Sequence, residues 1–255
     1  MKDFHVFVTS TSFGKHDPRL TETLQEKFGR VTYNETGRPL SAGDLLEIIS
    51  DVDGYIAGLD EITREVLEAG KQLQVVARYG VGVDNVDLEA ARELGITVTN
   101  TPGANAVSVA ELTIGLMLAQ VRSLVKAAQA TRKGEWPRVN GLTLEGKTVG
   151  LIGLGDIGQE VARRLKAFGA RVVAFDVQPD QDFAVQYGVE LLPRSEILDQ
   201  ADLVSLHCSL VPATRGMVNE EFLAQMKPGA YLINTARGEL IEEAALLQAL
   251  EEDRL

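Results

Sequence analysis

A glycine-rich segment is the part of the sequence whose spacing most clearly suggests chemistry. Gly153, Gly155 and Gly158 form the pattern G-x-G-x-x-G directly after an apolar run, Thr148–Ile152. In this pattern the first glycine permits a tight turn, the second lets a pyrophosphate approach the backbone, and the third lets a helix pack closely on a strand. The free N–H groups at the start of that helix would bind the phosphate charge. The segment predicts a dinucleotide site.

A carboxylate indicates which dinucleotide the site binds. Asp176 ends the next predicted strand, 18 residues after Gly158. An acid at this spacing can accept hydrogen bonds from both ribose hydroxyls of NAD, and its charge repels the extra phosphate of NADP. The next basic residue after Asp176 is Arg194. We therefore expect NAD as the cofactor; the alternative interpretation is that Asp176 is a solvated carboxylate in a turn.

Short β-branched runs alternate with amphipathic stretches, which predicts parallel sheets with crossover helices. In the first part of the chain we expect strands at Val6–Thr9, Tyr55–Ala57, Val75–Arg78 and Ile96–Thr99. Helices are expected at Pro18–Phe28, Asp44–Ser50, Thr63–Ala69 and Leu88–Leu94, with Thr63 as an N-cap.

A second βα series follows a long apolar stretch, Ala104–Thr131, which predicts one helix buried between layers or against a partner subunit. The boundary between the two series lies near Asn100–Asn105, so we expect domains at residues 1–100 and 101–255. Strands are expected at Thr148–Ile152, Arg171–Phe175, Glu190–Leu191, Leu203–Leu206 and Tyr231–Asn234. Helices are expected at Ile157–Phe168, Asp180–Tyr187, Ser195–Leu198, Glu220–Gln225 and from Glu242 onward.

Composition restricts the partners. The chain of 255 residues is 45% hydrophobic and carries a net charge of −12, so we expect a globular protein that binds neither nucleic acid nor a membrane surface. The longest apolar run, Leu112–Val121, is too short to span a bilayer. A single cysteine, Cys208, excludes an internal disulfide and fits a reducing compartment, so a cytoplasmic location is expected.

Five segments follow one another along the chain in a characteristic order. They are Val76–Asp87, Asn100–Gly103 with Val109–Glu111, Val149–Gly158, Leu206–Leu210 with Pro212–Thr214, and Leu232–Gly238. Together they resemble the D-2-hydroxyacid dehydrogenases, and within them the phosphoglycerate dehydrogenase group. The resemblance implies an α/β fold with two Rossmann-like domains. These are a flavodoxin-like substrate domain and an NAD-binding doubly wound parallel sheet that begins with a long dimerisation helix, so a homodimer is implied.

The activity that this resemblance implies is reversible hydride transfer between NADH and a small 2-oxo acid. Arg237 maps onto the family's substrate-binding arginine, and a guanidinium can donate two parallel hydrogen bonds to a carboxylate. The alternative for Arg237 is a surface arginine that caps nearby carbonyls. Tyr79, Gly80 and Val81 match the loop whose backbone amides meet the substrate, and Arg78 would add positive charge beside it.

The resemblance also implies a set of cofactor-binding residues and no metal ligands. His207 is expected as a wall residue near the nicotinamide, not as the catalytic acid, and Cys208 as a backbone contact with an inert thiol. The complete set is Val109, Gly153, Gly155, Asp156, Ile157, Gly158, Asp176, His207, Cys208, Pro212, Thr235, Ala236 and Arg237.

One part of the family pattern has no match. The family's proton-donating histidine and its glutamate partner belong beyond Leu255, and neither His5 nor His16 matches that donor. We therefore expect a C-terminally truncated Rossmann domain and crippled catalysis by this chain. The alternative is a non-catalytic NAD(H)-binding interaction protein of corepressor type on the same scaffold. The substrate stays open among phosphoglycerate, glycerate, lactate and longer 2-oxo acids.

Overall fold

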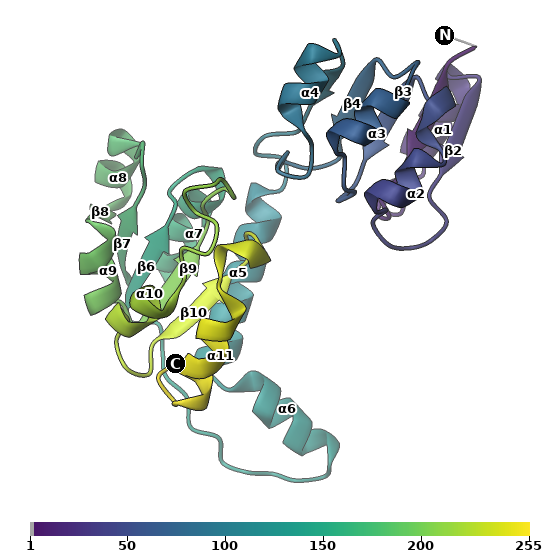
Figure 1. The fold of residues 1–255 in the computed structure, drawn as a ribbon. Coiled ribbons are helices and arrows are strands. Elements are labelled where there is room, and N and C mark those ends of the chain that lie inside the picture. Colours follow the sequence, from purple (N-terminus) through teal and green to yellow (C-terminus); the bar gives the residue numbers. More distant parts are fainter. Residues whose placement is uncertain (1–2) are drawn as a thin grey trace. The chain divides into compact units, whose positions relative to one another are not determined.

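The computed structural model describes residues 3–255 and divides into two compact units. Unit 1 ends at Ala104 and unit 2 comprises Asn105–Leu255, a division within the segment Asn100–Asn105 and four residues after the end of the first expected domain. Each unit has its own parallel sheet (Figure 1). The expected alternation of strands and helices is therefore present in both parts of the chain.

Unit 1 is built on a five-stranded parallel sheet of order β2-β1-β3-β4-β5. This order is the flavodoxin-like arrangement, in which the strand order reverses beside β1. Because all strands are parallel, the loops that leave β1, β3 and β4 emerge at one edge. The strands are β1 His5–Val8, β2 Arg30–Tyr33, β3 Gly54–Ala57, β4 Val75–Arg78 and β5 Thr97–Thr99.

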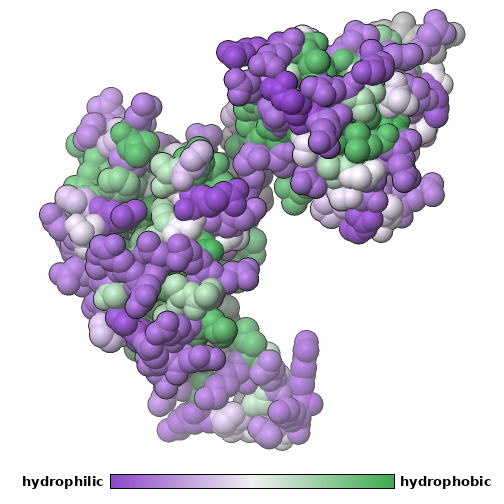
Figure 2. All heavy atoms as spheres, viewed as in Figure 1, coloured by the Kyte–Doolittle hydropathy of each residue, from purple (hydrophilic) through white to green (hydrophobic). Residues whose placement is uncertain are grey.

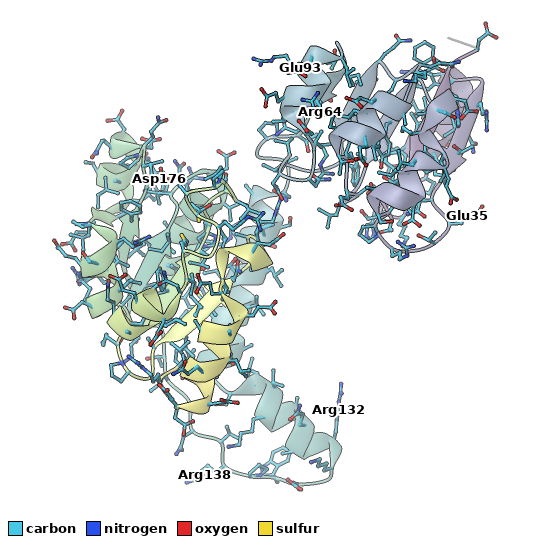
Figure 3. The ribbon with its side chains drawn as sticks, viewed as in Figure 1. Glu35, Arg64, Glu93, Arg132, Arg138 and Asp176 are labelled. Atoms are coloured by element: carbon cyan, nitrogen blue, oxygen red, sulfur yellow. The ribbon has the colours of Figure 1, made fainter. Side chains whose placement is uncertain are left out.

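Side-chain oxygens cap three of the unit 1 helices. Thr63 accepts a hydrogen bond from the N–H of Val66, as the sequence predicted, while Ser41 and Asp87 cap their own helices. Arg64 and Glu93 form an ion pair of 2.7 Å between α3 and α4 (Figure 3). The helices are α1 Arg19–Lys27, α2 Ala42–Leu46, α3 Arg64–Ala69 and α4 Leu88–Glu93, and a 3-10 turn lies at Ile49–Asp51.

Two local features of unit 1 differ from the sequence prediction. Strand β2 was missed because it is an edge strand whose residues are exposed or half-buried, so it lacks a buried apolar pattern. The single helix expected over Asp44–Ser50 was wrong, because the chain forms α2 and then a separate 3-10 turn. That division lets both Leu45 and Ile49 reach the core fully buried.

Unit 2 is built on a five-stranded parallel sheet of order β10-β9-β6-β7-β8. Counted within the unit, the order corresponds to the 3-2-1-4-5 part of the dinucleotide-binding arrangement, with the reversal between β6 and β9. Ligands of such sheets bind where the strand order reverses, outside the carboxyl ends of the strands. The strands are β6 Thr148–Ile152, β7 Arg171–Phe175, β8 Glu190–Leu191, β9 Leu203–Leu206 and β10 Tyr231–Asn234.

Helices cover both faces of the unit 2 sheet, and each face has its own apolar core. Leu151 and Val172 pack under α5, α7 and α8, whereas Ile152 and Val204 pack under α9, α10 and α11. Burial on both faces explains why these strands are continuous apolar runs. The covering helices are α5 Ala106–Val121, α7 Asp156–Ala167, α8 Gln181–Tyr187, α9 Arg194–Gln200, α10 Glu220–Gln225 and α11 Glu243–Glu251.

The prediction of one long helix over Ala104–Thr131 was wrong. The chain forms α5 and a second helix, α6 Leu124–Arg132, and the two are bent by 68°. Ser123 has a φ of 50°, the left-handed region, which ends regular helix geometry. The last carbonyl of α5, that of Val121, accepts a hydrogen bond from the N–H of Leu142 at 2.7 Å. No single helix within residues 3–255 is long and apolar enough to cross a bilayer; α5 and α6 reach that length only together, across the bend.

Candidate functional site

The glycine loop joins β6 to α7 and takes a shape that only glycine allows at two positions. Gly153 has a φ of +106°, and a Cβ there would lie 2.6 Å from the carbonyl carbon of His207. A Cβ on Gly158 would lie 2.3 Å from the carbonyl oxygen of Gly153. Gly155 differs, because a Cβ there would meet no atom within 4 Å. The loop is closely packed against the protein at Gly153 and Gly158 and open at Gly155, where a pyrophosphate is expected to approach.

Asp176 lies at the end of β7 and is bonded to the glycine loop (Figure 3). One carboxylate oxygen accepts a hydrogen bond from the N–H of Leu154 at 2.6 Å, and the other accepts from the N–H of Gln178 at 2.8 Å. A carboxylate has about four acceptor positions, so further acceptor capacity is available for ribose hydroxyls. The open side of Gly155 and the half-buried Asp176 together fit NAD.

His207 follows β9 and forms part of the wall beneath the glycine loop. Its Nε2 lies 2.9 Å from the hydroxyl of Ser205, which is fully buried. Burial lowers the pKa of His207 to about 4. Burial also raises the pKa of the Cys208 thiol. At neutral pH both side chains are therefore uncharged, and the wall role of His207 and the inert thiol of Cys208 stay predictions.

The segment that carries Arg237 leaves β10 in a side-chain-stabilised turn. Asn234 accepts a hydrogen bond from the N–H of Ala236 at 2.9 Å and donates from Nδ2 to the carbonyl of Arg237 at 2.7 Å. The Thr235 hydroxyl lies 2.9 Å from the hydroxyl of Thr113 on α5. Thr113 donates its proton to the carbonyl of Val109 at 2.8 Å, so Thr235 donates to Thr113. These bonds hold the backbone at Arg237 against the core helix.

The unit 2 residues predicted from the sequence gather at the carboxyl edge of its sheet. They follow four different strands, and parallel strands bring those ends to one edge. Asp156 and Ile157 form the first turn of α7, and Pro212 is exposed in the loop after β9. The remaining predicted positions at this edge are Gly153, Gly155, Gly158, Asp176, His207, Cys208, Thr235, Ala236 and Arg237, with Val109 on α5 beside Thr113.

Comparison with known proteins identifies this arrangement. Residues 114–255 match the model of the D-isomer specific 2-hydroxyacid dehydrogenase, NAD binding domain. The chain belongs to the D-isomer specific 2-hydroxyacid dehydrogenase family. NAD is thus the cofactor of unit 2, as the glycine loop and Asp176 predicted.

Relatives within this dehydrogenase family carry different substrate names. The chain is 44% identical over 236 residues to a D-3-phosphoglycerate dehydrogenase of Methanocaldococcus jannaschii, and the match spans 91% of this chain but 44% of that protein. It is 42% identical to a hydroxypyruvate reductase of Thermotoga maritima, over 91% of this chain and 76% of the relative. The chain therefore spans less than half the length of the phosphoglycerate dehydrogenase it matches.

Solved structures of the dehydrogenase family have the same fold. D-lactate dehydrogenase from Aquifex aeolicus, complexed with NAD and lactic acid, matches with a TM-score of 0.85 at 28% identity, covering 98% of this chain and 74% of that one. The TT0316 protein from Thermus thermophilus matches with a TM-score of 0.84 at 42% identity, covering 97% and 78%.

In unit 1, the loop expected to meet the substrate in this family follows β4. Every carbonyl of three consecutive loop residues accepts a hydrogen bond from within unit 1. The N–H groups of Gly80, Val81 and Gly82, in contrast, have no hydrogen-bond acceptor among residues 3–255. These peptide donors therefore keep their hydrogen-bonding capacity for a ligand. The carbonyl bonds are Thr101 N and Oγ1 to Gly80 at 3.0 and 3.1 Å, Asn100 Nδ2 to Val81 at 2.7 Å, and Arg78 Nε to Gly82 at 3.0 Å.

Arg78 ends β4, directly before this loop. Its side chain is buried, with the residue 4% exposed, and donates to the carbonyls of Ala57, Gly58 and Gly82. The positive charge expected beside the loop therefore belongs to a guanidinium bonded to the protein itself, including the loop carbonyl of Gly82. Tyr79 is 44% exposed and stacks edge-on against Phe13, with ring centroids 5.5 Å apart.

Several residues of the two sites were missed by sequence reasoning. Asn234, Thr113 and Ser205 bond the unit 2 site, while Asp60 and Thr9 lie beneath the unit 1 loop. Asn234 could have been found, because an asparagine at a strand end favours an Asx turn. Thr113, Asp60 and Thr9 bond partners far away in the sequence, which local patterns do not encode. Ser205 bonds His207, two residues away and therefore on the same side of an extended segment, so this pair could also have been found. Within the described part of the chain no group of three or more His, Cys, Asp or Glu side chains could hold a metal ion.

Proposed function

We propose that this protein is an NAD-dependent oxidoreductase that interconverts a D-2-hydroxy acid, D-3-phosphoglycerate or a related one, and its 2-oxo acid. The observation that carries the proposal is the glycine loop, bonded to Asp176, at the same sheet edge as Arg237 in unit 2. This edge combines a dinucleotide site with a guanidinium suited to a carboxylate. Bound NADH supplies the hydride, and bound NAD accepts it in the reverse direction.

The chain's own residues would bind and polarise the substrate. The Arg237 guanidinium would donate to the substrate carboxylate and stabilise negative charge that develops on the carbonyl oxygen. The N–H groups of Gly80 and Val81 in unit 1 would donate to the carboxylate. Asn234 and the Thr235–Thr113 hydroxyl pair would keep the Arg237 backbone in one conformation, which reduces the ordering required when substrate binds.

A proton must also reach the developing alkoxide, and His207 is not suited to supply it. Its pKa of about 4 leaves it unprotonated at neutral pH, and its Nε2 is bonded to Ser205. His5 lies buried at the start of β1 in unit 1, with Nδ1 3.0 Å from the carbonyl of Asp51. His16 does not match the position of the family's proton-donating histidine. We therefore propose that the 255-residue polypeptide tested alone binds NADH but turns over slowly.

The function is tested by mixing the polypeptide with NADH and a panel of 2-oxo acids: 3-phosphohydroxypyruvate, hydroxypyruvate, glyoxylate and pyruvate. Loss of NADH absorbance measures turnover, and quenching of Trp136 fluorescence or enhancement of NADH fluorescence measures binding. NADH binding with slow turnover of one or more acids supports the proposal. Failure to bind NADH would overturn it, and turnover at the usual rate of about 10 per second would contradict the slow-turnover part.

We also infer that two copies of the chain associate through α5 and α6. The side of α5 that faces away from the unit 2 core carries Leu112 and Leu116, which are 57% and 39% exposed. Leu124 and Val125 of α6 are at least half exposed, and Trp136 beyond it is 90% exposed. In Figure 2 apolar residues interrupt the largely hydrophilic surface of unit 2. Exposed apolar groups of this extent favour a protein partner, and the commonest such partner is a second copy.

A further inference from the structure

A buried carboxylate in unit 1 has no part in the function proposed so far. Asp60 follows β3 and is 0% exposed. Its oxygens accept hydrogen bonds from the N–H of Leu40 at 2.7 Å, from the N–H of Gly58 at 2.9 Å and from the hydroxyl of Thr9. A buried carboxylate is costly unless such donors surround it. Here three donors do so, and two of them belong to the loops that leave β1 and β3.

The bonds of Asp60 fix the backbone at Gly58. The N–H of Gly58 lies within hydrogen-bond distance of both Asp60 and the Thr9 hydroxyl, the latter at 3.0 Å. A Cβ on Gly58 would lie 3.1 Å from the Cα of Ser10, so the loops after β1 and β3 are in close contact. These contacts restrict the backbone conformation at Gly58 and therefore the orientation of its carbonyl.

That carbonyl is bonded to Arg78. The Nη1 of Arg78 donates to the carbonyls of Ala57, at 2.7 Å, and Gly58, while Nε donates to Gly82 at 3.0 Å. Asn85 adds a second connection, because its Nδ2 donates to the carbonyl of Asp60 at 2.7 Å. One buried guanidinium therefore joins the end of β3 to the loop that carries the Gly80, Val81 and Gly82 N–H groups.

We propose that Asp60 and Arg78 are positioning residues that hold the Tyr79–Gly82 loop in the conformation that binds the carboxylate of the substrate. Asp60 fixes Gly58, Gly58 and Ala57 orient the guanidinium of Arg78, and Arg78 fixes the carbonyl of Gly82. With its carbonyls bonded, the loop presents its N–H groups without further ordering. The proposal rests on the proposed function, because it assigns the substrate carboxylate to this loop.

Positioning predicts a specific pattern of effects. A loop displaced by about 1 Å loses roughly 10- to 100-fold of its effect on a bound group. Asp60→Asn replaces one acceptor oxygen with an N–H donor that faces other donors, so the affinity for a carboxylate ligand should fall by that factor. NADH affinity should not change, because the glycine loop and Asp176 belong to unit 2.

The experiment uses the whole 255-residue chain, with oxalate as the probe, in the presence of NADH. Oxalate affinity is measured for the wild type, Asp60→Asn, Arg78→Lys, Thr9→Val and Thr9→Ser, and NADH affinity for each is measured by fluorescence. Heteronuclear NOE values of the Gly80, Val81 and Gly82 amides report loop order directly. Asp51→Asn is the matched control, because Asp51 pairs with Arg30 at 2.5 Å at the amino end of β3, away from the loop.

Support requires that oxalate affinity and loop NOE values fall in Asp60→Asn, Arg78→Lys and Thr9→Val, while Thr9→Ser and Asp51→Asn match the wild type. Thr9→Val and Arg78→Lys decide the question if Asp60→Asn does not fold. Unchanged affinity and unchanged NOE values in the folded variants would overturn the positioning role. If wild-type loop amides do not shift with oxalate, the proposed substrate contact fails, and the NOE comparison still shows whether the network orders the loop.

Discussion

The carboxylate of Asp176 accepts a hydrogen bond from the backbone N–H of Leu154 at 2.6 Å. Leu154 lies within the glycine loop, between Gly153 and Gly155, and its side chain is buried. The residue expected to select NAD therefore also holds the loop expected to bind the pyrophosphate. One substitution at Asp176 should affect both functions at once.

Replacing Asp176 should weaken NAD binding and reduce discrimination against NADP. Asp176→Ala removes a charged acceptor of the ribose hydroxyls, an effect of about 1.5 to 3 kcal/mol or roughly 10- to 100-fold in affinity. Because the repulsive charge is also gone, NADP affinity should fall less than NAD affinity or rise. Titration of both nucleotides checks this, with Asp182→Ala, an exposed acid of α8, as the control. Equal losses for NAD and NADP would contradict the assigned role.

The glycines of the loop should separate folding from binding. Gly155→Ala meets no atom of the protein, so its unfolding free energy should stay within about 0.5 kcal/mol of the wild type. Its NAD affinity should fall at least about tenfold, because the new methyl group lies where the pyrophosphate approaches.

Gly158→Ala should instead lower stability, by about 1 to 3 kcal/mol, because its Cβ would lie 2.3 Å from a backbone oxygen. Thermal unfolding and NAD titration of both variants test the contrast. Gly43→Ala in unit 1 is the control, since a Cβ there meets only the Ser41 hydroxyl oxygen, at an ordinary contact distance of 3.8 Å. Unimpaired NAD binding by Gly155→Ala would contradict the prediction that the pyrophosphate binds beside Gly155.

His207 should make stability depend on pH. Its pKa is lowered to about 4 in the folded protein, so the unfolded chain, with a pKa near 6.5, binds the proton more readily. This contribution to stability is complete above about pH 6.5 and is lost as the pH falls toward 4, with a loss of about 2 kcal/mol by pH 5.

His207→Gln, which does not titrate, should lack this part of the pH dependence, and its stability at pH 8 should fall only moderately. Urea unfolding at several pH values between 5 and 8 measures the difference. The control is His16→Gln, because His16 is exposed in unit 1. If wild type and His207→Gln lose the same stability as the pH falls, the pKa of His207 is not lowered in the folded protein.

Charges on α5 should prevent the proposed association of two chains. Leu112→Glu with Leu116→Glu places two carboxylates on the exposed side of α5, which should weaken dimerisation by at least about 100-fold. Analytical ultracentrifugation at micromolar concentration checks the oligomeric state. Leu247→Glu on α11, where Leu247 is 58% exposed, is the control. A monomeric wild type would contradict the homodimer directly.

Local patterns in the sequence were sufficient for much of the fold. The central strands of unit 2 were predicted at their observed bounds, because strands buried on both faces are continuous apolar runs. The glycine loop was also predicted correctly. Glycine is required at Gly153 by its positive φ, and at both Gly153 and Gly158 because a Cβ would collide with nearby backbone atoms. Edge strand β2 and the bend after Val121 were missed because neither has a local apolar signal of its own.

What the sequence determined by itself is the cofactor. A glycine pattern and an acid at a characteristic spacing depend on steric and hydrogen-bonding rules that act over a short stretch of chain. What only the tertiary structure decided is the place of Arg78 and Asp60. A basic residue at a strand end looks available to a substrate anion. In the folded unit it is buried, bonded to carbonyls that lie 21 and 20 residues away in the chain. Only packing of β3 beside β4 brings those carbonyls to it, so its role could not be inferred from its neighbours in sequence.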